Sequence, residues 1–109
     1  MSSTTTLPAY VPEADQQVRR LPQWNLILLD DDQHTYDYVV EMLQKLLGHS
    51  QEVAWTMAEE VDRTGRSIIA TTTKERAELK HEQVAGFGPD WRLKNSKTSM
   101  QTVLEPVQS

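Results

Sequence analysis

The stretch "WNLILLDDDQHTYDYVVEMLQKLL", residues 24–47, contains a strand signal and a helix signal with three aspartates between them. Its first part, "WNLILL", is mostly apolar and has the length and branched content of a buried strand. From Tyr36 onward, apolar residues recur at the spacing of one helical face. The stretch therefore predicts a strand that leads into an amphipathic helix. It places Asp30, Asp31 and Asp32 together at the junction.

Polar residues and glycines mark where the predicted helices begin and end. Thr35 is a predicted N-cap for the first helix, and Gly48 can end that helix in the left-handed conformation. Ser50 is a predicted N-cap for a second apolar stripe, which stops before Gly65. "TTKE", residues 72–75, fits a capping box for a third helix that runs to about position 85.

The order of the elements predicts the fold class. "RSIIAT" (66–71) and "SMQTVLEP" (99–106) are short apolar segments typical of strands, and "GFGPDW" (86–91) interrupts the chain before the second of them. The resulting order is βααβαβ. We therefore predict an α+β domain, a small two-layer sandwich with three helices on one face of a three-stranded sheet.

Composition divides the chain into a core and two ends. Residues 1–20 are rich in Ser, Thr and Pro without an apolar period, so we predict a flexible N-terminal extension. Residues 21–106 are predicted to form the folded core and residues 107–109 a short C-terminal tail.

The overall charge and the missing residue types restrict the function. A net charge of −5 argues against nucleic acid or an anionic membrane as the main partner, because both need a positive protein surface. The chain has no cysteine, and it shows neither a membrane-spanning apolar run nor a signal-peptide pattern. We expect a cytoplasmic monomer.

Three uses of the aspartate run can be weighed from the residues alone. In a calcium loop starting at Asp30, the sixth position, which needs glycine, would be Thr35. A phospho-acceptor domain needs a second strand ending in Asp and a longer chain. His34, His49 and His81 could serve acid–base chemistry, but no phosphate-binding loop, serine elbow or HExxH motif accompanies them. We therefore predict neither an enzyme nor a metal or cofactor site.

A cationic ligand suits the aspartates better. Paired carboxylates at a strand-to-helix junction, beside an apolar helix face, fit a group with a positive end and an apolar tail. Each hydrogen bond to a charged group contributes roughly 1.5–3 kcal/mol, and micromolar binding needs about 8 kcal/mol, so several contacts must act together.

Residues 24–47 closely resemble the signature of the ClpS family, the adaptors of Clp ATP-dependent proteases. The resemblance continues through "GRSIIATTTKERAELK" (65–80) and ends with "VLEP" (103–106), so it covers about residues 21–106. The family's fold is a small βααβαβ sandwich. The resemblance implies a protein that binds the free N-terminal residue of N-degron substrates, typically Leu, Phe, Tyr or Trp. It also implies delivery to the N-terminal domain of a ClpA- or ClpC-type AAA+ unfoldase.

The resemblance also implies the site. In the family, an Asn, the following Asp and a later His surround the substrate ammonium, and these positions hold Asp30, Asp31 and Asp62 here. The side-chain pocket corresponds to Leu28, Val39, Met42 and Ala58, with His34 and Tyr36 at its lip. Glu75 and Lys80 correspond to family positions that contact the unfoldase.

This chain departs from the family pattern at four of these positions. Asp30 and Asp62 replace Asn and His, while Tyr36 and Ala58 replace two methionines. One replacement adds bulk at the lip and the other removes it from the pocket, so the preferred substrate residue is open. Two alternatives remain: a regulator that docks on the unfoldase without delivering substrates, and a metal- or phosphoryl-dependent signalling domain. The pocket residues can equally be core, Glu75 a helix cap and Lys80 a solvated side chain.

Overall fold

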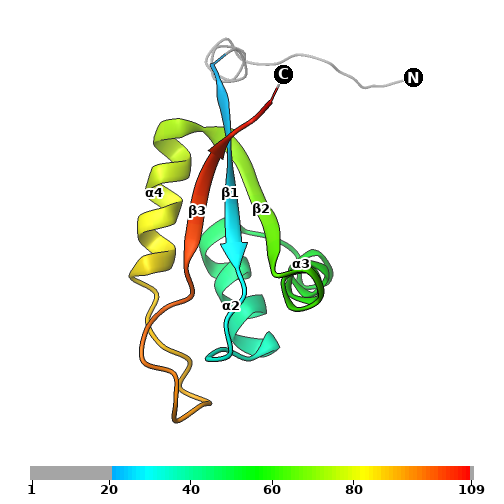
Figure 1. Cartoon of the computed structure of the whole chain (residues 1–109), viewed down its shortest axis with the longest axis vertical. Helices are drawn as coiled ribbons and strands as arrows, with labels where there is room; N and C mark the ends of the chain where they lie inside the picture. The colour runs from blue at the N-terminus through cyan, green and yellow to red at the C-terminus, as the bar shows by residue number, and fades with distance from the viewer. Residues whose placement is uncertain (1–20, 109) are drawn as a thin grey trace, which may run out of the picture.

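The three helices and three strands follow the predicted order. The computed structural model describes residues 21–108. Its elements are β1 (Gln23–Leu29), α2 (Tyr36–Leu47), α3 (Gln51–Thr64), β2 (Arg66–Thr73), α4 (Lys74–Ala85) and β3 (Thr102–Pro106). β1 lies at the centre of the sheet and pairs antiparallel with β2 and β3 (Figure 1). The predicted α+β βααβαβ sandwich is confirmed, whereas the flexible extension (1–20) lies outside the described residues.

Most of the predicted helix ends are confirmed. The Thr35 hydroxyl accepts a hydrogen bond from the Tyr38 N–H at 3.2 Å, Ser50 caps α3 in the same way, and Gly48 has φ of 70°. The capping box at residues 72–75 is wrong by one position. Thr73 is the N-cap of α4, and its hydroxyl accepts from the Arg76 N–H. The reason is that strand pairing continues as far as Thr73, opposite Gln23, and the helix begins only after it.

The core lies between one face of the sheet and the helices. Leu26, Leu28 and Ile69 point to this face and are at most 1% exposed. α3 and α4 contact the sheet directly, and α2 packs against both of these helices. On the opposite face, Ile68 and Val103 are exposed. The sheet is therefore covered by helices on one side only, as the sequence predicts.

The segment Gly86–Gln101, here called the Asp90 loop, connects α4 to β3 and is held by a buried carboxylate. The Asp90 side chain is 0% exposed. Its Oδ2 accepts hydrogen bonds from the N–H of Thr35 at 2.7 Å and from the Thr35 hydroxyl at 2.8 Å. Its Oδ1 accepts from the N–H and the guanidinium of Arg92, at 3.0 and 3.1 Å. Asp90 thus joins the Asp90 loop to the N-cap residue of α2.

These hydrogen bonds control the protonation of Asp90. Burial by itself raises the pKa of the Asp90 carboxyl, but the donors of Thr35 and Arg92 outweigh it and hold that pKa below its ordinary value. A carboxyl with a lowered folded-state pKa stabilises the fold above its unfolded-state pKa. This stabilisation is lost as the pH falls through the folded-state pKa.

Further hydrogen bonds close the Asp90 loop on itself and onto α2. The Tyr38 hydroxyl donates to the Gly88 carbonyl at 2.6 Å, and the Gly88 N–H donates to the Ser99 hydroxyl at 2.6 Å. The Asp90 N–H donates to the Ser96 hydroxyl at 2.7 Å. Although it has no helix or strand of its own, the Asp90 loop is a fixed part of the fold.

We predict that Asp90→Ala lowers the free energy of unfolding by about 3 kcal/mol at neutral pH, because it removes a buried, fully hydrogen-bonded carboxylate and takes the acceptor from partly buried donors of Thr35 and Arg92. Urea unfolding measures the loss. The difference from the unmodified protein should shrink below about pH 4, where carboxyls become protonated. Asp37→Ala, at an exposed aspartate in the first turn of α2, is the control and should cost less than about 1 kcal/mol. Equal stability of the two variants would contradict this role of Asp90.

Candidate functional site

The three predicted aspartates form an exposed turn at the end of β1. β1 ends at Leu29, and the N–H of Asp30 donates to the Gly65 carbonyl at 3.0 Å, which ties the turn to the end of α3. Asp30, Asp31 and Asp32 are all exposed residues, and the Asp31 side chain is 30% exposed. The three aspartates thus lie between β1 and α2, the strand-to-helix junction where the sequence predicts them.

Asp31 is held in place by the residues that follow it. Its Oδ1 accepts from the Gln33 N–H at 2.9 Å and lies 2.7 Å from Nδ1 of His34. Within residues 21–108, no hydrogen bond is formed by Oδ2 of Asp31 or by the carboxylate of Asp30. These oxygens remain available as acceptors for a ligand.

His34 lies inside the turn rather than at the mouth of an apolar pocket. Its side chain is 1% exposed, and its Nε2 lies 2.7 Å from the carbonyl oxygen of Thr98 in the Asp90 loop. Because the Asp31 carboxylate and the Thr98 carbonyl both accept, both bonds form together only when each ring nitrogen carries a proton. His34 therefore links Asp31 to the Asp90 loop, a role that the sequence does not predict.

Tyr36, which the resemblance places at the lip of the pocket, and Asp62, which it places at the ammonium site, are in direct contact. The Tyr36 hydroxyl donates to Oδ2 of Asp62 at 2.7 Å. The Tyr36 ring also lies against Trp55 of α3, with 4.9 Å between ring centres. The hydrogen bond to Asp62 raises the pKa of the Tyr36 phenol above its ordinary value. α2 and α3 are thus joined over the region where the pocket is predicted.

The four apolar residues predicted to line the pocket are buried in the core. Leu28 and Met42 are 0% exposed, Ala58 is 3% exposed and Val39 is 5% exposed. They belong to one cluster, and Tyr36 packs against it from outside. The structure brings the predicted residues together, but in a closed arrangement.

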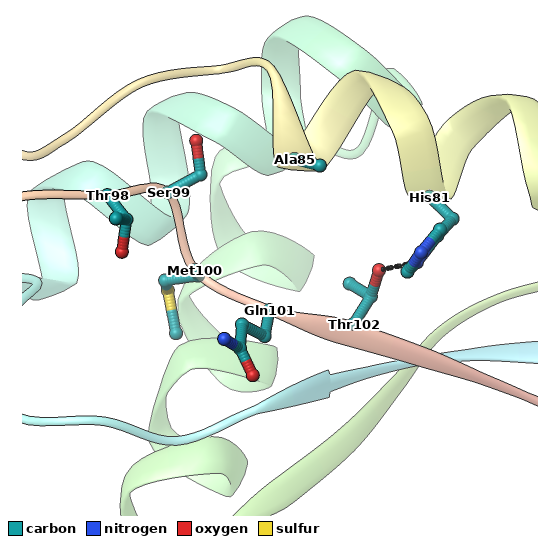
Figure 2. A pocket seen from close by; sticks show the side chains of 7 residues that line it. All are labelled: His81, Ala85, Thr98, Ser99, Met100, Gln101 and Thr102. Carbon is teal, nitrogen blue, oxygen red and sulfur yellow. Dashed lines mark hydrogen bonds between the residues drawn. The ribbon is translucent and has the colours of Figure 1, made fainter.

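Two cavities share one wall next to the aspartate turn. The smaller, of about 230 Å³, is lined by Asp30 and Asp31 on one side and by the end of the Asp90 loop on the other. The larger, of about 390 Å³, lies between that same loop segment and α4, where His81 Nδ1 lies 2.6 Å from the Thr102 hydroxyl (Figure 2). Asp30 and Asp31, the predicted ammonium-binding residues, therefore line a small cavity bounded by the Asp90 loop.

The two residues predicted to contact an unfoldase differ in their surroundings. Glu75 is exposed in the first turn of α4. The Lys80 ammonium donates to the Leu46 carbonyl at 2.8 Å and so satisfies an acceptor in the last turn of α2. Lys80 has a structural role whatever else it contacts.

Neither a metal centre nor a membrane segment is found in the described part of the chain. Residues 21–108 contain no group of three or more Asp, Glu or His side chains placed to hold a metal ion. Over the same residues, no helix has the length and apolar character needed to cross a bilayer.

Comparison with known proteins places this geometry in a family. A family model described as ATP-dependent Clp protease adaptor protein ClpS matches residues 19–89. The ClpS adapter of Thermosynechococcus vestitus is 34% identical over 85 residues, which cover 75% of this chain and 90% of that protein. The ClpS adapter of a Nostoc species is 34% identical over 87 residues, covering 77% of this chain and 90% of that protein.

A solved structure shows the same fold. ClpS2 of Agrobacterium tumefaciens, bound to L-phenylalaninamide, superposes with a TM-score of 0.70 at 19% identity. The match covers 81% of this chain and all of that one.

We predict that Asp62→Asn lowers the pKa of the Tyr36 phenol, because it replaces the charged carboxylate acceptor that now raises this pKa with a neutral, weaker one. The difference in tyrosinate absorbance between the protein and its Tyr36→Phe variant isolates Tyr36 from the other two tyrosines during an alkaline titration. Asp32→Asn, in the aspartate turn, serves as the control and should leave the pKa of the Tyr36 phenol unchanged. An unchanged titration in Asp62→Asn would show that the two side chains are apart in solution.

Proposed function

The chain belongs to the ClpS family of ATP-dependent Clp protease adaptors, and we propose that it binds the free N-terminal residue of substrate proteins and delivers them to a Clp ATPase. In this role it has no catalytic activity of its own and acts in the cytoplasm. The observation that carries the proposal is the exposed pair Asp30 and Asp31 at the end of β1, with carboxylate oxygens free to accept.

The fixed orientation of Asp31 supports binding of an ammonium group. A substrate α-ammonium needs acceptors, and carboxylates form the strongest hydrogen bonds of this kind. Because Asp31 is already held by Gln33 and His34, it loses little conformational freedom when a ligand binds. ClpS2 of Agrobacterium tumefaciens binds L-phenylalaninamide, which offers a free amine and an apolar side chain. These are the features of an N-terminal residue.

We infer that the apolar pocket opens when the substrate side chain enters. Leu28, Met42 and Ala58 are buried in one cluster, and Tyr36, which packs against that cluster, donates a hydrogen bond to Asp62. A substrate ammonium that takes the Asp62 carboxylate competes with the Tyr36 hydroxyl for it. Ala58, which is smaller than the methionine typical of the family, gives the entering side chain more room.

The closed pocket also favours a second function. A regulator that docks on the unfoldase without delivering substrates needs no open pocket, and the core residues named above need not open for it. In both functions the partner is the N-terminal domain of a ClpA- or ClpC-type unfoldase, with Glu75 and Lys80 as proposed contacts. Peptide binding separates the two functions.

We predict selective micromolar binding of peptides that differ only at residue one, measured by fluorescence anisotropy with Leu, Phe, Tyr, Trp, Arg and Ala in that position. Acetylation of the N-terminal amine should abolish binding. Asp31→Ala should weaken it roughly ten-fold or more, because a hydrogen bond to a charged group contributes roughly 1.5–3 kcal/mol. Asp37→Ala should bind normally. Equal affinity for all the peptides would contradict N-terminal recognition and favour the regulator that docks without delivering substrates.

We predict that Glu75→Lys weakens binding of the protein to the isolated N-terminal domain of a Clp unfoldase by roughly five-fold, since it reverses an exposed charge at the proposed contact. Calorimetry measures this affinity, and peptide binding should stay the same. Glu78→Lys makes the same charge change at an exposed position of α4 and is the matched control. Equal losses in both variants would assign the effect to net charge rather than to a contact of Glu75.

A further inference from the structure

The tip of the Asp90 loop differs in charge from the rest of the protein. Residues 91–97, here called the basic tip, contain Arg92, Lys94 and Lys97 and no acidic residue, whereas the whole chain has a net charge of −5. Lys94 and Lys97 are exposed, and Trp91 is 81% exposed. The basic tip therefore presents an aromatic ring and positive charges together.

The basic tip is held by the buried Asp90 network. The Arg92 guanidinium lies 4.6 Å from the centre of the Trp91 ring. It also donates to Asp90 at 3.1 Å and to Glu41 of α2 at 3.3 Å. Trp and Arg are the residue types most enriched among energetically dominant interface positions, and a fixed side chain loses less entropy on binding. Arg92 is fixed by these bonds, and the exposed Trp91 ring beside it is a residue type suited to a binding role.

Three hydrogen bonds place the basic tip beside the aspartate turn. The Asn95 amide donates to the Asp32 carbonyl and the Lys97 N–H donates to the Gln33 side chain, both at 3.3 Å. The third is the contact between His34 and Thr98. The loop after α4 and the turn after β1 lie at the same end of the molecule (Figure 1). A ligand whose amine reaches Asp30 and Asp31 is therefore close to the basic tip.

The family match does not assign a role to this surface. The match to the family model ends at residue 89 and so does not include the basic tip.

We propose that the basic tip is a second contact for the substrate polypeptide, which binds acidic and apolar residues that follow the N-terminal residue. The inference rests on the proposed function, because it requires the substrate amine at the aspartate turn. A peptide with a positive N-terminus and negative residues behind it complements the negative turn and the positive tip at once. A nucleic acid or an anionic membrane would meet the three aspartates beside the tip and be repelled.

The test uses peptides that begin with Leu and place an Asp-Glu pair, a Lys-Lys pair or a Gln-Gln pair at positions 2–3, 4–5 or 6–7. At low salt, the peptide with the Asp-Glu pair should bind about five-fold more tightly than the peptide with the Lys-Lys pair for at least one of these three placements. Higher ionic strength should reduce this preference. Trp91→Ala should lower the affinity for these peptides about three-fold or more. It should leave the affinity for leucinamide unchanged, because leucinamide has no downstream residues.

The charge contribution is tested with Lys94→Glu combined with Lys97→Glu. Lys74→Glu combined with Arg76→Glu makes the same change in net charge at the start of α4, away from the Asp90 loop (Figure 1). The inference requires that only the first pair removes the preference for acidic residues. Equal effects of both pairs, or no preference in the unmodified protein, overturn it. If amine-dependent binding persists in that case, the proposed function stands, whereas absence of amine-dependent binding overturns both.

Discussion

The rest of the site depends on the buried carboxylate of Asp90. Its two oxygens bind the N–H and hydroxyl of Thr35 on one side and the N–H and guanidinium of Arg92 on the other. Thr35 is the N-cap of α2, so one side chain fixes the start of that helix and the path of the Asp90 loop. A buried charge is stable only when it is hydrogen-bonded. Here the two bonds from Arg92 lie within the Asp90 loop, and the two bonds from Thr35 join that loop to the segment that follows the aspartate turn. The geometry of the turn is therefore set from outside its own sequence.

The elements of the fold are encoded locally, which is why the sequence predicts them. Apolar spacing and the caps at Thr35 and Ser50 depend on residues within a few positions of one another. The one-residue error at Thr73 has a non-local cause, because the pairing of β2 with β1 delays the helix. The Asp90–Thr35 contact joins residues 55 positions apart, and nothing in "GFGPDW" identifies its partner. Local sequence patterns cannot identify such long-range polar contacts.

The same division between local and long-range contacts explains why only part of the site could be predicted. Asp30 and Asp31 directly follow a buried strand, so the sequence places them at the strand end, where the structure has them exposed. The resemblance assigns Tyr36 and Asp62 to one site, and the structure has them in contact. The orientation of His34 was not predictable, because it is decided by the Thr98 carbonyl of a distant loop. The state of the pocket was not predictable either. Leu28 and Met42 have the same sequence pattern whether they line a cavity or fill a core.

The arrangement of charge on the surface favours one orientation of a bound ligand. Acidic side chains collect at the turn after β1, while the positive charges of Lys94 and Lys97 lie in the adjoining loop. Opposite charges that are separated but close attract a ligand with the reverse polarity and repel ligands of a single sign. A polypeptide has such polarity at its N-terminus whenever acidic residues follow the free amine. Asp90 holds the aspartate turn and the basic tip in one rigid unit, so the fold itself sets the orientation of a bound polypeptide. Selectivity then depends on these charges as well as on the pocket.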